Sequence, residues 1–342
     1  LKGLSIVPDQ NAGLSPGGGH SAGFAAAGPP SLPDKGPLML TSVVLVLVYA
    51  AAGALSHALG KKALDTGLPT PAFLVLRSLT GVLTAALIFA VLWARNGLPD
   101  IPPGAWGLAA LTGLCHPVLS NALYFTGLRR GDLSVMSPLI NTTPLFTAVF
   151  AGVFLGETQS PLSLAGIGLI LVGAVVVPLS SAGRHRAASG RGRAVDSALL
   201  GIGSAVAVAL YLVCGRQAMK SVEPRFVALV LNVMALVAFS TAGAAGYTRA
   251  SVEDRRHWIP SAHAAWLTVA SGVLVYGLCC FLGLTVLKQI TASLVSALAS
   301  TAAVFALIFS IVLLGERPSR ERWFGALLVV TGCVLCSLGR HQ

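Results

Sequence analysis

His116 is the residue best placed to do chemistry inside a long apolar part of the chain. It lies near the centre of residues 104–126, an apolar stretch that could form one helix. Ser120 and Tyr124 follow at four-residue intervals and so share its helix face, and Asn121 lies at the edge of that face. A titratable side chain at such depth commonly serves a function, so these residues predict a polar binding site. Their alternative role is hydrogen bonding between packed helices.

A second group of hydroxyl and amide side chains occurs twice, in two apolar stretches separated by 159 positions. The first copy consists of Ser134, Ser137, Asn141 and Thr142, and the second of Ser293, Ser296, Ser300 and Thr301. In each copy the first three residues lie on one helical stripe. Two matched stripes would line the two sides of one cavity, although serines also allow helices to pack closely.

Prolines bracket the first of these copies. Pro138 and Pro144 lie on either side of Asn141 and Thr142. Because proline removes a backbone donor and breaks a helix, we expect a discontinuous helix here. Its unpaired backbone carbonyls would then be free to bind a polar solute.

Three other polar residues lie in apolar stretches. Tyr276 corresponds to Pro117 under the 159-residue shift, so we expect it to form a wall of the same cavity or to pack in the core. Arg77 lies six residues into its stretch, and we expect its long side chain to extend to the membrane interface rather than to bind solute. His57 lies near the end of its stretch, and we expect it in water.

The acidic residues exclude several kinds of catalytic site. All twelve lie between the apolar stretches or at their ends, as Glu157 and Glu316 do. An intramembrane aspartyl protease or a metal-dependent enzyme needs carboxylates in the interior, so neither class fits. The C-x-x-C of Cys333 and Cys336 has no second pair or nearby histidine, and we predict no metal and no cofactor. An intramembrane enzyme with His116 as the base stays an alternative.

The composition places these stretches in a membrane. Of the 342 residues, 55% are hydrophobic and 10% are charged, against about 25% charged in soluble domains. The net charge is +11, but the 23 Lys and Arg residues are spread between apolar stretches, so no nucleic-acid partner is expected. We predict ten membrane-spanning helices, at residues 38–59, 71–93, 104–126, 132–154, 161–179, 196–217, 224–247, 264–286, 290–314 and 320–338.

The breaks between these stretches predict four parts of the chain. They are a disordered Gly- and Pro-rich tail at 1–36, a five-helix repeat at 37–180, a basic linker at 181–195 and a second five-helix repeat at 196–340. Because five is an odd number, the second repeat enters the membrane in the opposite sense to the first. Inverted repeats around a midplane site are typical of secondary transporters.

Matching residues in the two halves support the repeat. The 159-residue shift places Leu155-Gly156-Glu157 on Leu314-Gly315-Glu316, and it places Gly166 and Gly173 on Gly325 and Gly332. With these features, and with Arg77 in the second span, the sequence resembles the EamA family of the drug/metabolite transporter superfamily. The resemblance implies a ten-helix exporter of amino acids or other small metabolites in the cell (plasma or inner) membrane.

The orientation in the membrane is predicted differently by two criteria. The resemblance implies that both termini are cytoplasmic. Lys and Arg residues are more frequent in the odd-numbered loops than in the tails and even-numbered loops, which favours both termini outside. Both orientations stay open at this point.

We therefore predict an all-α membrane protein that moves a small molecule by alternating access within the lipid bilayer, with a homodimer as one form of assembly. The substrate-binding residues are predicted to be His116, Asn121, Tyr124, Ser137, Asn141, Thr142, Tyr276, Ser296, Ser300 and Thr301. The alternatives are the intramembrane enzyme and a membrane scaffold whose Pro-rich tail binds a partner.

Overall fold

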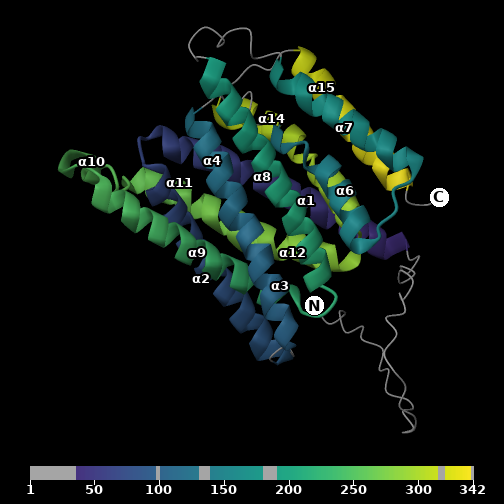
Figure 1. The fold of residues 1–342 in the computed structure, drawn as a ribbon, viewed down its shortest axis with the longest axis horizontal. Coiled ribbons are helices and arrows are strands. Elements are labelled where there is room, and N and C mark those ends of the chain that lie inside the picture. Colours follow the sequence, from purple (N-terminus) through teal and green to yellow (C-terminus); the bar gives the residue numbers. More distant parts are fainter. Residues whose placement is uncertain (1–35, 98–100, 131–138, 180–190, 315–319, 340–342) are drawn as a thin grey trace. The chain divides into compact units, whose positions relative to one another are not determined.

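The computed structural model describes residues 36–97, 101–130, 139–179, 191–314 and 320–339 (Figure 1). These residues form helices and connecting turns, with no strand among them, so the prediction of an all-α protein is confirmed. In the first half the helices are α1 (Gly36–Asp65), α2 (Thr70–Asn96), α3 (Pro103–Gly113), η1 (Leu114–Leu119), α4 (Ser120–Arg130), α6 (Thr143–Leu155) and α7 (Pro161–Leu179).

The second half repeats this order, with the short helices α10 and α13 in addition to the described helices of the first half. Its helices are α8 (Arg191–Ala218), α9 (Pro224–Arg249), α10 (Val252–Arg256), α11 (Ala262–Gly272), η2 (Val273–Cys279), α12 (Cys280–Gln289), α13 (Ala292–Ala299), α14 (Ala302–Leu314) and α15 (Arg320–Leu338). The segment η2 is a π-helical turn inside a longer helix, whereas η1 spans a kink at His116.

Seven helical segments are long and apolar enough to cross a membrane, within the described ranges. They are Leu40–Asp65, Thr70–Arg95, Pro103–Gly127, Leu199–Ala218, Pro224–Arg249, Ala262–Gln289 and Ala292–Leu313. Three shorter apolar helices are Thr143–Leu155, Pro161–Gly173 and Trp323–Leu338. The chain is therefore a multi-pass membrane protein, and the count of ten spans stays a prediction.

Side chains are distributed as a membrane requires. Large apolar residues such as Leu87 and Val153 are exposed on the outside, whereas Arg77, Asn232 and Thr268 are fully buried inside. Lipid offers no hydrogen bonds to a polar group. The polar side chains therefore face the interior, where other helices can pair with them.

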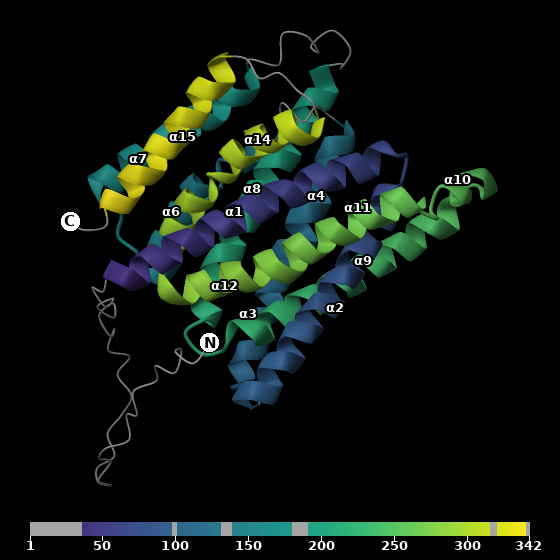
Figure 2. The ribbon, with the colours of Figure 1, turned by 180° about the vertical axis from the view of Figure 1, so that it is seen from behind.

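Helices α7 and α15 lie side by side in both ribbon views (Figures 1 and 2). Glycines make this possible, because a Cβ built on Gly166 would lie 2.6 Å from the Gly332 carbonyl oxygen, and one on Gly173 would lie 2.5 Å from that of Gly325. The two backbones therefore touch at two levels. As the residue number rises along α7 it falls along α15, so the two helices are antiparallel.

Candidate functional site

One cavity of about 1100 Å³ lies among α1, η1, α4, α8, η2, α12 and the α13–α14 pair. Its mouth includes Asp65, Gly67, Asp254 and His257, all of which are exposed. From the mouth it extends along α1 as far as Tyr49. At 1.5 Å per residue this is a depth of roughly 24 Å.

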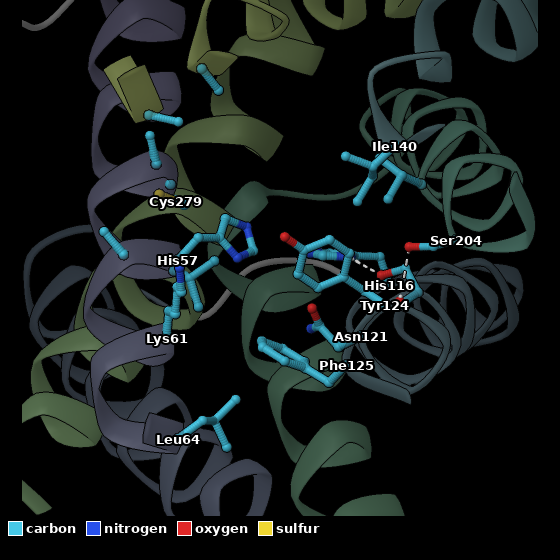
Figure 3. Close-up of a pocket in the computed structure, with 18 of the residues that line it drawn as sticks. His57, Lys61, Leu64, His116, Asn121, Tyr124, Phe125, Ile140, Ser204 and Cys279 are labelled. Carbon is cyan, nitrogen blue, oxygen red and sulfur yellow. Dashed lines mark hydrogen bonds between the residues drawn. The ribbon is translucent and has the colours of Figure 1, made fainter. Parts of the chain in front are cut away.

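Six of the ten predicted binding residues line this cavity. They are His116, Asn121, Tyr124, Asn141, Ser296 and Ser300. Figure 3 shows His57 and Lys61 on the α1 wall, with His116, Asn121 and Tyr124 facing them. The structure thus brings together residues from the third, fourth and ninth predicted spans.

The helix is interrupted at His116. Its φ and ψ of −148° and 127° are not helical, and Pro117 follows it. The imidazole Nδ1 is hydrogen-bonded to the Ser120 hydroxyl, and the ring lies 5.0 Å from the Tyr211 ring, centroid to centroid. The other half has its π-helical turn at the corresponding place, residues 273–279, where Val275 and Cys279 line the cavity. Such turns inside helices frequently mark functional sites.

Both matched stripes contain a helix break, as the prolines predicted for the first. Asn141 and Thr142 form a turn before α6, and Ser300 and Thr301 form the turn between α13 and α14. The expectation of free carbonyls between Pro138 and Pro144 is wrong for Leu139, and Leu298 is bonded in the same way in the second copy. The Thr142 hydroxyl donates to the Leu139 carbonyl and the Thr301 hydroxyl donates to that of Leu298, at 2.6 and 2.7 Å. Each carbonyl also accepts the threonine's own N–H, so both of its lone pairs are used.

Thr142 and Thr301 do not line the cavity, because their hydroxyl groups form these bonds and stabilise the two helix breaks instead. Tyr276 does not line the cavity either. It is fully buried, and its hydroxyl accepts a 2.9 Å hydrogen bond from Asn121 Nδ2. Its role is to orient Asn121, which does reach the cavity. Ser134 and Ser137 lie outside the described residues.

Hydrogen bonds join the helices at the end of the cavity opposite the mouth. The Glu157 carboxylate accepts from the backbone N–H of Ala292 at 3.0 Å and from the Ser293 hydroxyl at 2.8 Å. Gln159 Nε2 donates to the same hydroxyl at 2.9 Å. Ser293 is thus buried in this contact and is not in the cavity, contrary to its place in the predicted stripe.

Two further bonds lie at this end. Ser42 donates to Gln289 Oε1 at 2.6 Å, and Arg216 donates to the Leu287 carbonyl at 2.5 Å. Ser42 comes seven residues before Tyr49, the last cavity residue on α1, which places it about 10 Å further along the helix. We call these bonds of Ser42, Glu157, Gln159 and Arg216 the closed-end contacts.

Comparison with known proteins gives this arrangement a family. A model described as "EamA-like transporter family" matches residues 40–179 and, a second time, residues 197–338. This chain belongs to the EamA-like transporter family. The sequence resemblance to EamA proteins is therefore confirmed.

Individual relatives of this EamA protein are distant. Human solute carrier family 35 member E4 is 31% identical over 164 residues, which are 46% of this chain and 45% of that protein. A protein of Sinorhizobium sp, "Uncharacterized transporter in cobO 3'region", is 32% identical over 78 residues, 23% of this chain and 55% of that protein. The matched part spans about half the length of these curated relatives.

One solved structure, described as "Crystal structure of protein", superposes with a TM-score of 0.69. The match covers 87% of this chain and 97% of that chain, at 20% sequence identity. At this identity the similarity establishes a shared fold, and the site of this EamA protein is argued from its own residues.

Arg77 lies elsewhere than the sequence predicted. It does not extend to the membrane interface but is fully buried, and its Nη2 donates to the Ser56 hydroxyl at 2.8 Å. Its guanidinium carbon lies 5.4 Å from the ring centres of Phe73 and Phe125 and 5.2 Å from that of Tyr276. These three rings come from three separate helices, which together hold the cation away from lipid.

His57 also differs from its prediction as a residue in water near the end of its span. Helix α1 continues to Asp65, so His57 lies inside it and lines the cavity. Its ring packs edge to face on Tyr124, 5.5 Å between centroids. The cavity therefore has two histidines on facing walls, and His116 is not the only titratable group there.

Other lining residues were not predicted, although the sequence contains a signal for them. A shift of 155 residues also aligns the start of the two halves, and it pairs Tyr49 with Ser204 and His57 with Leu212. All four line the cavity. Extending the repeat into the first and sixth spans would have found them. Within the described ranges, no three His, Cys, Asp or Glu side chains gather as a metal site would require.

Proposed function

We propose that this EamA protein is a secondary transporter that exports a small metabolite, such as an amino acid, by alternating access across the plasma or inner membrane. The observation that carries the proposal is the asymmetry of the cavity. It reaches solvent at the Asp65 and Asp254 end, and the closed-end contacts shut the other end. A pore would be open at both ends, whereas an alternating carrier is closed at one end at a time.

The closed-end contacts are suited to opening because most of them join the two halves. Ser42, Glu157 and Gln159 belong to the first half, and their partners Gln289, Ala292 and Ser293 belong to the second. All are hydrogen bonds, and the partners Gln289 and Ala292 lie at helix ends. Each contributes about 0.5–1.5 kcal/mol, or up to about 3 kcal/mol where a charged group takes part. Water can replace them when the two halves move apart.

The proposal includes ten spans in two inverted repeats, residues 37–180 and 196–340, joined by the linker 181–195. The α7–α15 contact supports it. Gly166 touches Gly332 and Gly173 touches Gly325, and the 159-residue shift exchanges these two pairs. A two-fold axis between two equivalent, antiparallel helices produces such an exchange. Repeats related in this way would lie in opposite senses in the membrane.

The chemistry of the cavity supports a small polar solute. Its deep part presents hydroxyl, amide and imidazole groups from His57, His116, Asn121, Tyr124 and Ser300. Such groups replace the water around a solute. The paired helix breaks put Asn141 and Ser300 on equivalent positions of the two halves, so a bound solute would contact both halves at once.

Transport into sealed vesicles tests the proposal. The full chain would be reconstituted into liposomes that are loaded with a mixture of unlabelled amino acids, and exchange of each labelled amino acid would be followed. We expect at least one to exchange faster than in protein-free liposomes, and excess of that amino acid to block the exchange. Cells with and without the gene would be compared by mass spectrometry of their medium. No difference in either measurement would contradict the proposal.

A further inference from the structure

Arg77 is a buried cation without an anionic partner in the described part of the chain. One of its nitrogens is bonded to Ser56 Oγ, whereas Nε and Nη1 have no protein hydrogen-bond partner there. The ion pair found in these ranges joins Arg225 to Glu223 instead. Burying a charge is costly unless it is paired. The three surrounding rings offset a part of this cost by cation–π attraction, and the charge itself is not neutralised.

This charge lies directly behind the wall of the cavity. Phe125, whose ring packs on the guanidinium, lines the cavity, and so do His57, next to Ser56, and Asn121, the partner of Tyr276. Tyr124, which also lines the cavity, packs on the Phe125 ring with 5.2 Å between centroids. In an environment of low polarity the guanidinium charge acts over several ångströms. The deep cavity therefore has a positive potential.

The other charges of the cavity do not cancel it. Among the described lining residues, the acidic side chains are Asp65 and Asp254, and both lie at the mouth together with Lys61 and His257. Between them and Tyr49 the described walls consist of apolar groups and of polar groups, among them His57 and His116, without an acidic side chain. A cation entering the deep cavity would meet repulsion from Arg77, and an anion would meet attraction.

We propose that Arg77 makes the cavity selective for solutes that carry an anionic group, a carboxylate or a phosphate. This inference rests on the proposed function, because it assigns a charge to the transported solute. Arg77 is a specificity-determining residue that acts through the wall. The bound anionic group would lie between His57 and His116, whose N–H groups can donate to it.

Charged thiol reagents measure this potential without a substrate. Gly53 lines the cavity one turn before His57, and a Cβ added to it would meet nothing within 4 Å. Gly53→Cys would be made in a full chain whose six native cysteines are replaced by alanine. Its reaction rates with anionic sulfonatoethyl and cationic trimethylammonioethyl methanethiosulfonate would be compared with those of free cysteine. Taking the ratio of the two rates removes any change in the reactivity of the thiol itself.

We expect the anionic reagent to be favoured at Gly53→Cys relative to free cysteine. Arg77→Gln should lower this preference about tenfold, and Arg77→Lys should keep most of it. Arg225→Gln, which removes the other buried arginine, is the matched control and should leave the ratio unchanged. An unchanged ratio in Arg77→Gln would overturn the proposal. If that variant does not fold, a preference for the cationic reagent in the chain with Arg77 would overturn it as well.

Solute transport distinguishes this inference from the proposed function. Liposomes containing the full chain would be offered L-aspartate, glycerol phosphate, glycerol and putrescine. We expect an anionic solute to be taken up and putrescine to be excluded, and Arg77→Gln to reduce that uptake about tenfold. Uptake of putrescine above that of both anions would overturn the anion selectivity. Uptake of none of the four, with the reagent preference intact, would count against the transport of these solutes and not against the potential of the cavity.

Discussion

The hydroxyl of Tyr276 fixes the side chain of Asn121 from behind the cavity wall. Tyr276→Phe removes the acceptor of the 2.9 Å bond and leaves the Asn121 amide free to turn. The fold should survive, because one hydrogen bond contributes about 1 kcal/mol. We expect the KM for the transported solute to rise several-fold. Tyr247→Phe, at an exposed tyrosine, is the control and should transport like the parent protein.

Two histidines, His57 and His116, line the deep part of the cavity, and they determine how its charge depends on pH. Histidine is the side chain that titrates near neutrality, while Asp65, Asp254, Lys61 and His257 face the mouth. His116→Gln keeps hydrogen bonding and leaves His57 to titrate. We expect transport in this variant to retain part of its change when the medium is acidified. The double variant with His57→Gln should lose this dependence, and full loss in the single variant would show that His57 takes no part.

At the scale of elements, α13 begins at a carboxylate. Gly156 ends α6 with a φ of 68°, a left-handed conformation that suits glycine, and this turn directs Glu157 to the first N–H groups of α13. A negative charge is stabilising at a helix N-terminus. Glu157→Gln removes the charge and should open the closed end more often.

The test is labelling from the closed side. In the cysteine-free chain, Ser296→Cys places a thiol in the cavity one turn beyond Ser293. We expect a membrane-impermeant thiol reagent added on the closed side to react several-fold faster when Glu157→Gln is present. Glu253→Gln, at an exposed residue of α10, should not change the rate. Equal rates in all three chains would show that the Glu157 contact does not limit opening.

Two glycines of α7 test the α7–α15 contact: Gly166 lies in the contact, and Gly168 lies outside it as a control. At Gly166 a Cβ would lie 2.6 Å from the Gly332 carbonyl oxygen, so Gly166→Ala must push the two backbones apart. At Gly168, on the exposed face of α7, it would meet nothing within 4 Å. We expect Gly166→Ala to lower stability by about 1–3 kcal/mol, measured as a fall of the unfolding temperature in detergent. Gly168→Ala should be neutral or slightly stabilising.

At the scale of the whole molecule, the sequence predicted well what depends on neighbours along the chain. Apolar length located the helices, and Pro138 and Pro144 predicted the break at Asn141. The break at Ser300 has no proline between 292 and 314, yet it forms at the equivalent place because Thr301 bonds to Leu298. The 159-residue shift, which pairs Asn141 with Ser300, is the sequence signal for this second break.

What could not be predicted depends on neighbours far away in the chain. The depth of Arg77 in its span is compatible with a side chain in the interface or in the core. Phe73 lies four residues before Arg77 on the same helix, but the rings of Phe125 and Tyr276 decide the choice, and only the folded protein brings them to Arg77. Ser293 was placed in the cavity by its helical stripe, but Glu157, 136 residues earlier, removes it from the cavity.

Helix α13 has a further consequence. It is eight residues long, about 12 Å, with the Glu157 contact at one end and the Ser300 turn, which lines the cavity, at the other. A helix this short behaves as a stiff rod. In the proposed transporter, a solute that displaces Ser300 would therefore move Ala292 by a similar amount, so that binding in the cavity would directly change the strength of the Glu157 contact.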